Sequence, residues 1–85
     1  MAFKLRRKVS IAEVEYGTAL LDEERGQYWT LNPTGALILQ TLLGGGSLEL
    51  AAQVLTDEYE VDLETAGEDV QALVDDLSSA GLLER

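Results

Sequence analysis

The dipeptide Asn32-Pro33 divides this 85-residue chain into two parts with different hydrophobic periodicity. Before it, apolar and polar residues roughly alternate, as they do in strands that bury one face. After it, apolar residues recur three and four positions apart, as they do in helices that pack on a core. Asparagine is a favoured helix N-cap, and proline fits the first helical position because it has no N–H to lose. We therefore expect strands followed by helices, an α+β arrangement.

Three strands are predicted before Asn32. The first is marked by the β-branched residues Val9, Ile11 and Val14, whose phase slips after Ile11, so we expect a bulge or a strand end near Ala12. The basic segment over 4–8 is expected to be a frayed strand with solvated charges. The remaining predicted elements are a turn at Tyr16-Gly17, a strand over 18–22, a polar loop over 22–26 and a strand over 27–31.

Three helices are predicted from Asn32 onward, with Asn32, Ser47 and Asp62 as their N-caps. Glycines are expected to end the first helix at 44–46 and the third at 81, and Leu82-Leu83 is expected to pack back on the core. The third helix has the clearest apolar stripe, formed by Leu63, Ala66, Val70, Leu73, Val74 and Leu77. Residues 1–85 are thus expected to form one domain of winged helix-turn-helix type, a three-stranded antiparallel sheet followed by three helices.

The composition argues against several function classes. The chain has no His and no Cys, which removes the commonest general base and the sulfur ligands of metal sites. We therefore expect no enzyme, no metal and no cofactor. The net charge of -10 repels phosphate and anionic lipid, so neither nucleic acid nor membrane is an expected partner. No apolar run reaches the roughly 20 residues of a membrane span and no signal peptide is visible, so a cytoplasmic location is expected.

The predicted strand over 27–31 is the first candidate site, because it is the last strand in the chain and is expected at the edge of the sheet. Edge strands expose unpaired N–H and C=O groups, which proteins usually protect with charge or proline, and this segment has neither. An extended peptide is expected to add to it as a further strand. Trp29 and Leu31 are predicted on one face, and Tyr28 and Thr30 on the other. Whether Trp29 and Leu31 fill the core or line a groove stays open at this point.

The predicted third helix is the second candidate site. At 100° per residue, Asp69, Leu73 and Asp76 share one narrow stripe beside the apolar face. An apolar residue between two carboxylates suits a groove for a peptide with apolar and basic groups, and the acidic residues would speed its association in a salt-dependent way. The alternative is an ordinary solvated acidic face. If the helix and the edge strand are neighbours, they form two walls of one groove.

The order of features along the chain carries a family resemblance. A hydrophobic pair, an acidic loop with Gly, an aromatic residue, Leu-Asn and a small helix entry before a hydrophobic helix follow one another over 20–43. These residues are Leu20, Leu21, Asp22, Gly26, Tyr28, Leu31, Asn32, Thr34, Ala36 and Leu39. A later run comprises Asp69, Val70, Leu73, Val74 and Leu77, followed by Gly81-Leu82-Leu83. In these features the sequence resembles the PqqD-like family of RiPP recognition elements, small domains that bind leader peptides of ribosomally made, modified natural products.

The resemblance implies a winged helix-turn-helix that binds a leader peptide as an antiparallel strand, on the third strand and against the third helix. It implies no catalytic residue. Carried over to this sequence, it implies that the peptide-binding residues are Tyr28, Trp29, Thr30, Leu31, Asp69, Val70, Leu73 and Asp76.

The freestanding form and the helix entry Asn-Pro-Thr-Gly-Ala look most like the family members from lasso peptide clusters. The partners that this likeness implies are a precursor peptide, whose leader tends to carry Tyr-x-x-Pro, a leader peptidase and an ATP-dependent macrolactam synthetase. An alternative within the family is a peptide chaperone for a radical SAM enzyme, in pyrroloquinoline quinone or another pathway. A winged-helix DNA-binding regulator shares the fold, but the acidic third helix counts against it.

Overall fold

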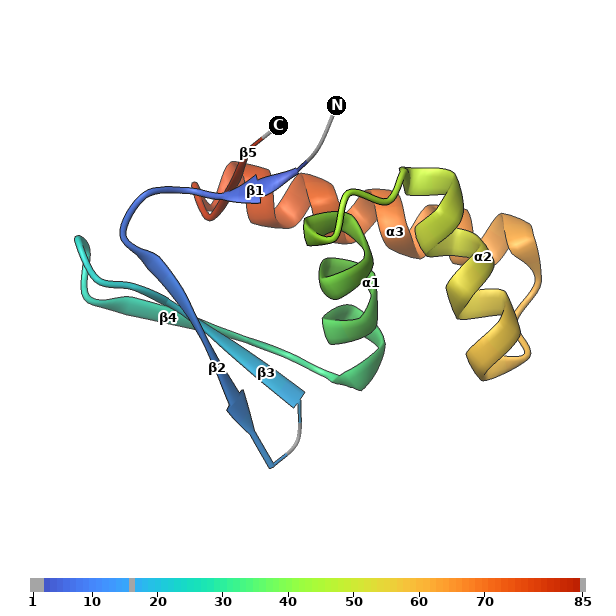
Figure 1. Cartoon of the computed structure of the whole chain (residues 1–85), viewed down its shortest axis with the longest axis horizontal. Helices are drawn as coiled ribbons and strands as arrows, with labels where there is room; N and C mark the ends of the chain where they lie inside the picture. Colours follow the sequence, from blue (N-terminus) through green and yellow to red (C-terminus); the bar gives the residue numbers. More distant parts are fainter. Residues whose placement is uncertain (1–2, 16, 85) are drawn as a thin grey trace.

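The computed structural model describes residues 3–15 and 17–84, and it has strands followed by helices, as the periodicity predicted (Figure 1). Tyr16, in the predicted turn, lies outside the described residues. The elements in chain order are β1 (Lys4–Leu5), β2 (Val9–Val14), β3 (Gly17–Asp22), β4 (Gln27–Leu31), α1 (Pro33–Leu43), α2 (Leu48–Tyr59), α3 (Leu63–Ser79) and β5 (Leu83–Glu84). The predicted α+β class, with three antiparallel strands before three helices, is confirmed.

Strands β2, β3 and β4 form one antiparallel sheet with β3 in the middle. The pairing of β2 with β3 runs without interruption from Val9 opposite Asp22 to Val14 opposite Gly17, so the bulge predicted near Ala12 is wrong. The phase slip has another cause. Strand β2 is mostly exposed to solvent, so the core does not impose a strict alternation on its side chains.

The basic N-terminal segment is also ordered differently from the prediction. It is not a frayed strand, because β1 pairs antiparallel with β5 at the other end of the chain, with Lys4 opposite Glu84. The Lys4 ammonium lies 3.3 Å from the Glu84 carboxylate, and the backbone N–H of Arg6 donates to the Leu82 carbonyl at 3.0 Å. Leu82 and Leu83 are buried in the core, as predicted.

All three predicted N-caps are present. Asn32 Oδ1 accepts from the Gly35 N–H at 2.8 Å, Ser47 Oγ from Leu50 at 3.0 Å and Asp62 Oδ1 from Thr65 at 2.7 Å. The hydrogen bonds from Thr65 hold the pKa of the Asp62 carboxyl below its ordinary value, so this cap is ionised at neutral pH. Each cap satisfies a backbone N–H that the first helical turn leaves without a partner.

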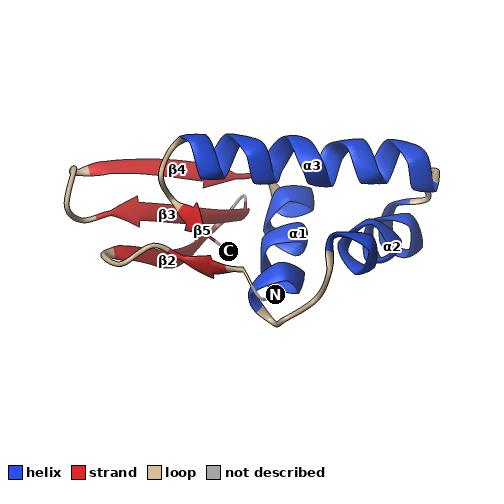
Figure 2. Ribbon diagram, turned by 90° about the horizontal axis from the view of Figure 1, so that it is seen from above, coloured by secondary structure: helices blue, strands red, loops and turns tan. Residues whose placement is uncertain are grey.

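The core joins the sheet to the helices. Its largest fully buried side chains come from β3 and from all three helices: Leu20, Leu39, Leu42, Leu55, Val70, Val74 and Leu77. Figure 2 shows α1 between the sheet and α2, while α3 runs alongside both. Among the described residues, no helix is long and apolar enough to cross a membrane.

Gly67 lies inside α3, and no atom of another helix or strand lies within 4 Å of the position that a Cβ would take. Glycine inside a helix loses more conformational entropy on folding than alanine does. Gly67→Ala is therefore expected to raise the free energy of unfolding by about 0.5–1 kcal/mol, measured by urea denaturation. A destabilised Gly67→Ala variant would mean that the surrounding helices close on this position.

Candidate functional site

The free side of β4 is the first component of the site. Within the described part of the chain, β4 hydrogen-bonds to β3 alone, with Leu21 opposite Tyr28, Leu20 opposite Trp29 and Ala19 opposite Thr30. Its other edge therefore presents backbone donors and acceptors to solvent, without the charge or proline that usually protects such an edge. Four of the five β4 residues are exposed.

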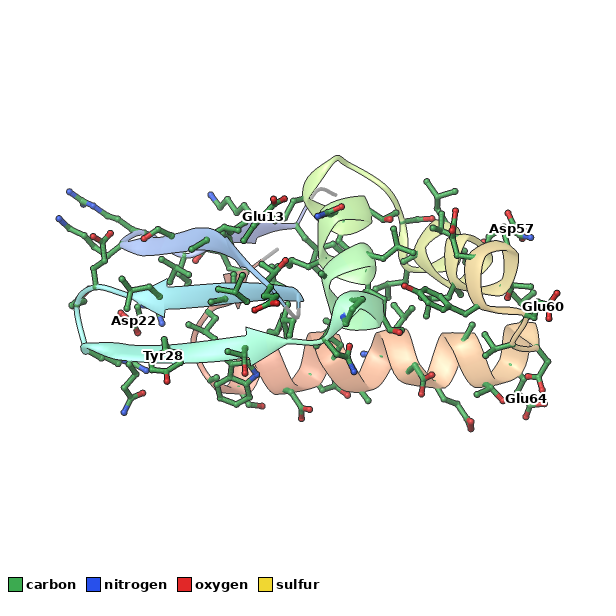
Figure 3. The ribbon with its side chains drawn as sticks, turned by 90° about the horizontal axis from the view of Figure 1, so that it is seen from below. Glu13, Asp22, Tyr28, Asp57, Glu60 and Glu64 are labelled. Atoms are coloured by element: carbon green, nitrogen blue, oxygen red, sulfur yellow. The ribbon has the colours of Figure 1, made fainter. Side chains whose placement is uncertain are left out.

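The two faces of β4 have different surroundings. Tyr28 and Thr30 point to the outer face, and Tyr28 is 73% exposed (Figure 3). Leu31 points to the inner face and belongs to the core, at 6% exposed. Trp29 shares the inner face with the fully buried Leu20 but is still 41% exposed. The question that the sequence left open therefore has two answers: Leu31 is a core residue, and Trp29 lies at the border of the core.

A groove of about 430 Å³ lies between the start of α1 and the middle of α3. Residues of α3 on one wall include Asp69, Leu73 and Asp76, which the sequence placed in one stripe. The complete lining is Asn32, Thr34, Gly35, Ile38, Asp69, Ala72, Leu73 and Asp76. Since Asn32 directly follows the last residue of β4, this groove begins where the open strand edge ends.

A second hollow, of about 320 Å³, adjoins the end of β4 and is lined by Val14, Thr30, Leu31 and Asn32. Asn32 lines both hollows. Thr30 and Leu31 of the predicted strand residues therefore line one hollow, Asp69, Leu73 and Asp76 of the predicted helix residues line the other, and the two hollows meet at Asn32. Asn32 itself was assigned only a capping role from the sequence, because its place between a strand edge and a helix gave no separate signal. Ala72 could have been found, since helical periodicity places it about 40° around the helix from Asp76, next to the stripe of Asp69, Leu73 and Asp76.

Val70 is placed apart from the other predicted residues of α3. It is 1% exposed, belongs to the core and lines a different hollow, between α2 and α3. The reason is helical geometry, because Val70 shares the core-facing side of α3 with Val74 and Leu77.

The groove is acidic on its α3 side. Asp69 and Asp76 are exposed, and neither belongs to an ion pair given by the described residues, which are Lys4 with Glu84 and Arg25 with Asp22. Both carboxylates are therefore available to a basic ligand, with the half-buried Leu73 between them as an apolar contact. Among the described residues, no group of three or more acidic side chains is placed to hold a metal ion. The arrangement is suited to binding an extended, partly basic peptide.

Comparisons with known proteins show the family of the chain. Residues 17–83 match the family model described as "Coenzyme PQQ synthesis protein D (PqqD)". A search of curated proteins found no match. One similar solved structure is "Lasso peptide synthetase B1 complexed with the leader peptide", at 46% identity over 100% of both chains with a TM-score of 0.94.

Two more distant structures share the fold. One, "TbiB1 in Complex with the TbiA(beta) Leader Peptide", is 28% identical with a TM-score of 0.86, over 95% of this chain and 94% of the other. The other is the solution structure of the PqqD part of Methylobacterium extorquens PqqCD, a stand-alone RiPP recognition element, at 23% identity and a TM-score of 0.77, over 98% of this chain and 88% of the other. Because the family model spans most of the sequence and a relative matches along its full length, the chain belongs to the PqqD-like family of RiPP recognition elements.

Proposed function

We propose that the chain binds the leader segment of a ribosomally made precursor peptide, as an added antiparallel strand on β4 that continues into the groove beside α3. The observation that carries this proposal is the continuity of the open edge of β4 with the groove at Asn32. Main-chain hydrogen bonds to the edge would supply affinity, and the hollows on either side of Asn32 would select side chains.

The comparisons favour a role in lasso peptide maturation. The similar structure at 46% identity is named as lasso peptide synthetase B1 complexed with the leader peptide. The likeness to the PqqD part of PqqCD, at 23% identity, supports the fold alone. We therefore place a chaperone for a radical SAM enzyme second. The acidic α3 disfavours a DNA-binding regulator, because nucleic-acid affinity depends on basic side chains that neutralise phosphates.

The proposed mechanism contains no bond chemistry on this chain. The chain holds the leader, so that the core segment of the precursor stays close to the enzymes that act on it. Those enzymes would be a leader peptidase and a macrolactam synthetase. Tethering raises the effective concentration of the precursor at an enzyme bound to the same module, which accelerates the reaction without a catalytic residue here.

Titration of the isotope-labelled chain with the leader peptide encoded beside it tests this proposal. We expect the backbone amide signals of Gln27–Leu31 to shift, together with those of Asp69 and Leu73, and the association rate to fall as salt is added. The control is the same peptide with prolines at its central positions, which lacks the N–H donors that strand addition requires. Shifts confined to α2, or equal binding of the proline peptide, would contradict strand addition.

A further inference from the structure

A separate hollow lies on the opposite side of α3 from the leader groove. It has a volume of about 350 Å³ and lies between α2 and α3. At about 100° per residue, the α3 residues that line it are centred roughly 150° around the helix from those that line the leader groove. The two sites can therefore be occupied at the same time. We name it the α2–α3 hollow, and its lining is Leu48, Glu49, Ala52, Gln53, Leu63, Gly67, Val70 and Gln71.

The floor of the α2–α3 hollow is apolar and open. Leu63, at the start of α3, lines the hollow and is 54% exposed. Gly67 deepens the opening, because a Cβ there would contact nothing within 4 Å. Packing in the isolated chain therefore does not require glycine at this position, although glycine weakens the helix. An apolar side chain from another molecule would fill the space and bury Leu63.

The rim of the α2–α3 hollow is acidic. Glu49, on α2, lies in its lining, and the exposed Glu64 borders it on α3, about 20° around the helix from the lining residue Gln71. From Ser47 to Glu84 the sequence has eleven acidic residues and no Lys or Arg. Figure 3 shows Asp57, Glu60 and Glu64 together at the end of the α2–α3 pair that points away from the sheet.

This charge decides between the possible occupants. A second copy of the chain would bring another acidic rim against the first, and the net charge of -10 opposes that approach. A basic partner meets a complementary surface, and acidic positions flanking an apolar pocket match a helix with basic residues on both sides of its apolar stripe.

We propose that the α2–α3 hollow is the docking site for a basic amphipathic helix of a partner protein. An apolar side chain of that helix enters between Leu48 and Leu63, above Gly67, while Lys or Arg residues on its borders pair with Glu49 and Glu64. The identification of the partner as an enzyme that processes the precursor rests on the proposed function. One face of α3 then holds the leader while the other holds the enzyme.

The test uses a synthetic helical peptide with leucines three and four positions apart and lysines on both borders, titrated into the isotope-labelled chain. We expect saturable shifts at Leu48, Ala52, Leu63 and Gly67. A matched peptide with glutamates in place of the lysines is expected to bind at least about 10-fold more weakly, because it repels the acidic rim.

Two variants separate this site from the leader groove. Gly67→Phe fills the hollow and is expected to weaken binding of the lysine peptide by about 10-fold or more while leader binding stays unchanged. A second variant does not place a bulky side chain in the helix: Glu49→Lys with Glu64→Lys, two exposed charge reversals, is expected to give the same selective loss. Leu73→Ala is the control in the leader groove and is expected to leave binding of the lysine peptide unchanged.

Three results would overturn the proposal: no saturable shift, shifts along Gln27–Leu31 in place of the hollow, or reversible self-association of the wild-type chain that Gly67→Phe abolishes in sedimentation equilibrium. A failure of leader binding alone would count against the proposed function, and the lysine-peptide titration would still report on the hollow.

Discussion

Replacing Gly17 with alanine is expected to lower the free energy of unfolding by roughly 3 kcal/mol or more. Gly17 begins β3 with a φ of +146°, a conformation that residues with a Cβ rarely adopt. A Cβ at this position would also collide with the carbonyl oxygen of Leu31, at the end of β4. The chain would have to separate β3 from β4 at the point where β4 leads into α1 and the leader groove.

Gly26→Ala is the matched control for this experiment. Gly26 also has a positive φ, +69°, but a Cβ there would contact nothing within 4 Å. The control carries a backbone penalty without the collision, so urea denaturation of the two variants separates the two effects. Equal losses of stability in Gly17→Ala and Gly26→Ala would mean that the close approach of Gly17 to Leu31 does not affect the free energy of unfolding.

Leu73→Ala is expected to weaken leader binding by about 1–3 kcal/mol, which is roughly a 5- to 150-fold rise in Kd. Leu73 is half-buried in the wall of the leader groove, between Asp69 and Asp76. Its side chain is therefore placed to lose its remaining contact with water when an apolar leader residue enters. Isothermal titration calorimetry with the leader peptide measures the change.

Leu63→Ala provides the comparison for Leu73→Ala. Both residues are partly exposed leucines of α3, but Leu63 lines the α2–α3 hollow and not the leader groove. Its leader affinity is expected to match that of the wild type, with circular dichroism confirming that both variants are folded. If Leu73→Ala is folded and binds the leader as tightly as the wild type, Leu73 does not contact the leader.

Local signals predicted the helices well, because each helix start is specified by residues next to it in the sequence. Asn32, Ser47 and Asp62 were identified as N-caps from residue type and position, and the side chain of each accepts a backbone hydrogen bond in the structure. The order of the three sheet strands was predicted for a similar reason. Their connections are short, and short connections favour antiparallel neighbours.

Features that depend on distant parts of the chain were not predicted. The pairing of β1 with β5 joins residues at opposite ends of the sequence, and the charged segment containing Lys4 carries no periodicity that points to Leu83. The bulge near Ala12 was inferred from an irregular apolar pattern, but the exposed position of β2 accounts for that pattern.

The candidate site was predicted in outline and completed by the structure. Helical periodicity was sufficient to bring Asp69, Leu73 and Asp76 to one wall of the groove. Periodicity placed Val70 in the apolar stripe that packs on the core, and only the family resemblance added it to the peptide-binding residues. Periodicity could not show that Trp29 lies at the border of the core, because that outcome depends on how β4 packs against the rest of the chain. Asn32 gained its place in the site from the same packing.

The pairing of β1 with β5 has a consequence for protein engineering. Since Lys4 and Glu84 are cross-strand neighbours, the polypeptide enters and leaves the folded unit at almost the same place. The domain is therefore suited to insertion into a surface loop of a host protein, because its two points of attachment lie close together. A short peptide linker would also suffice to close the backbone into a circle, and new ends could then be opened in the exposed hairpin at residues 23–26.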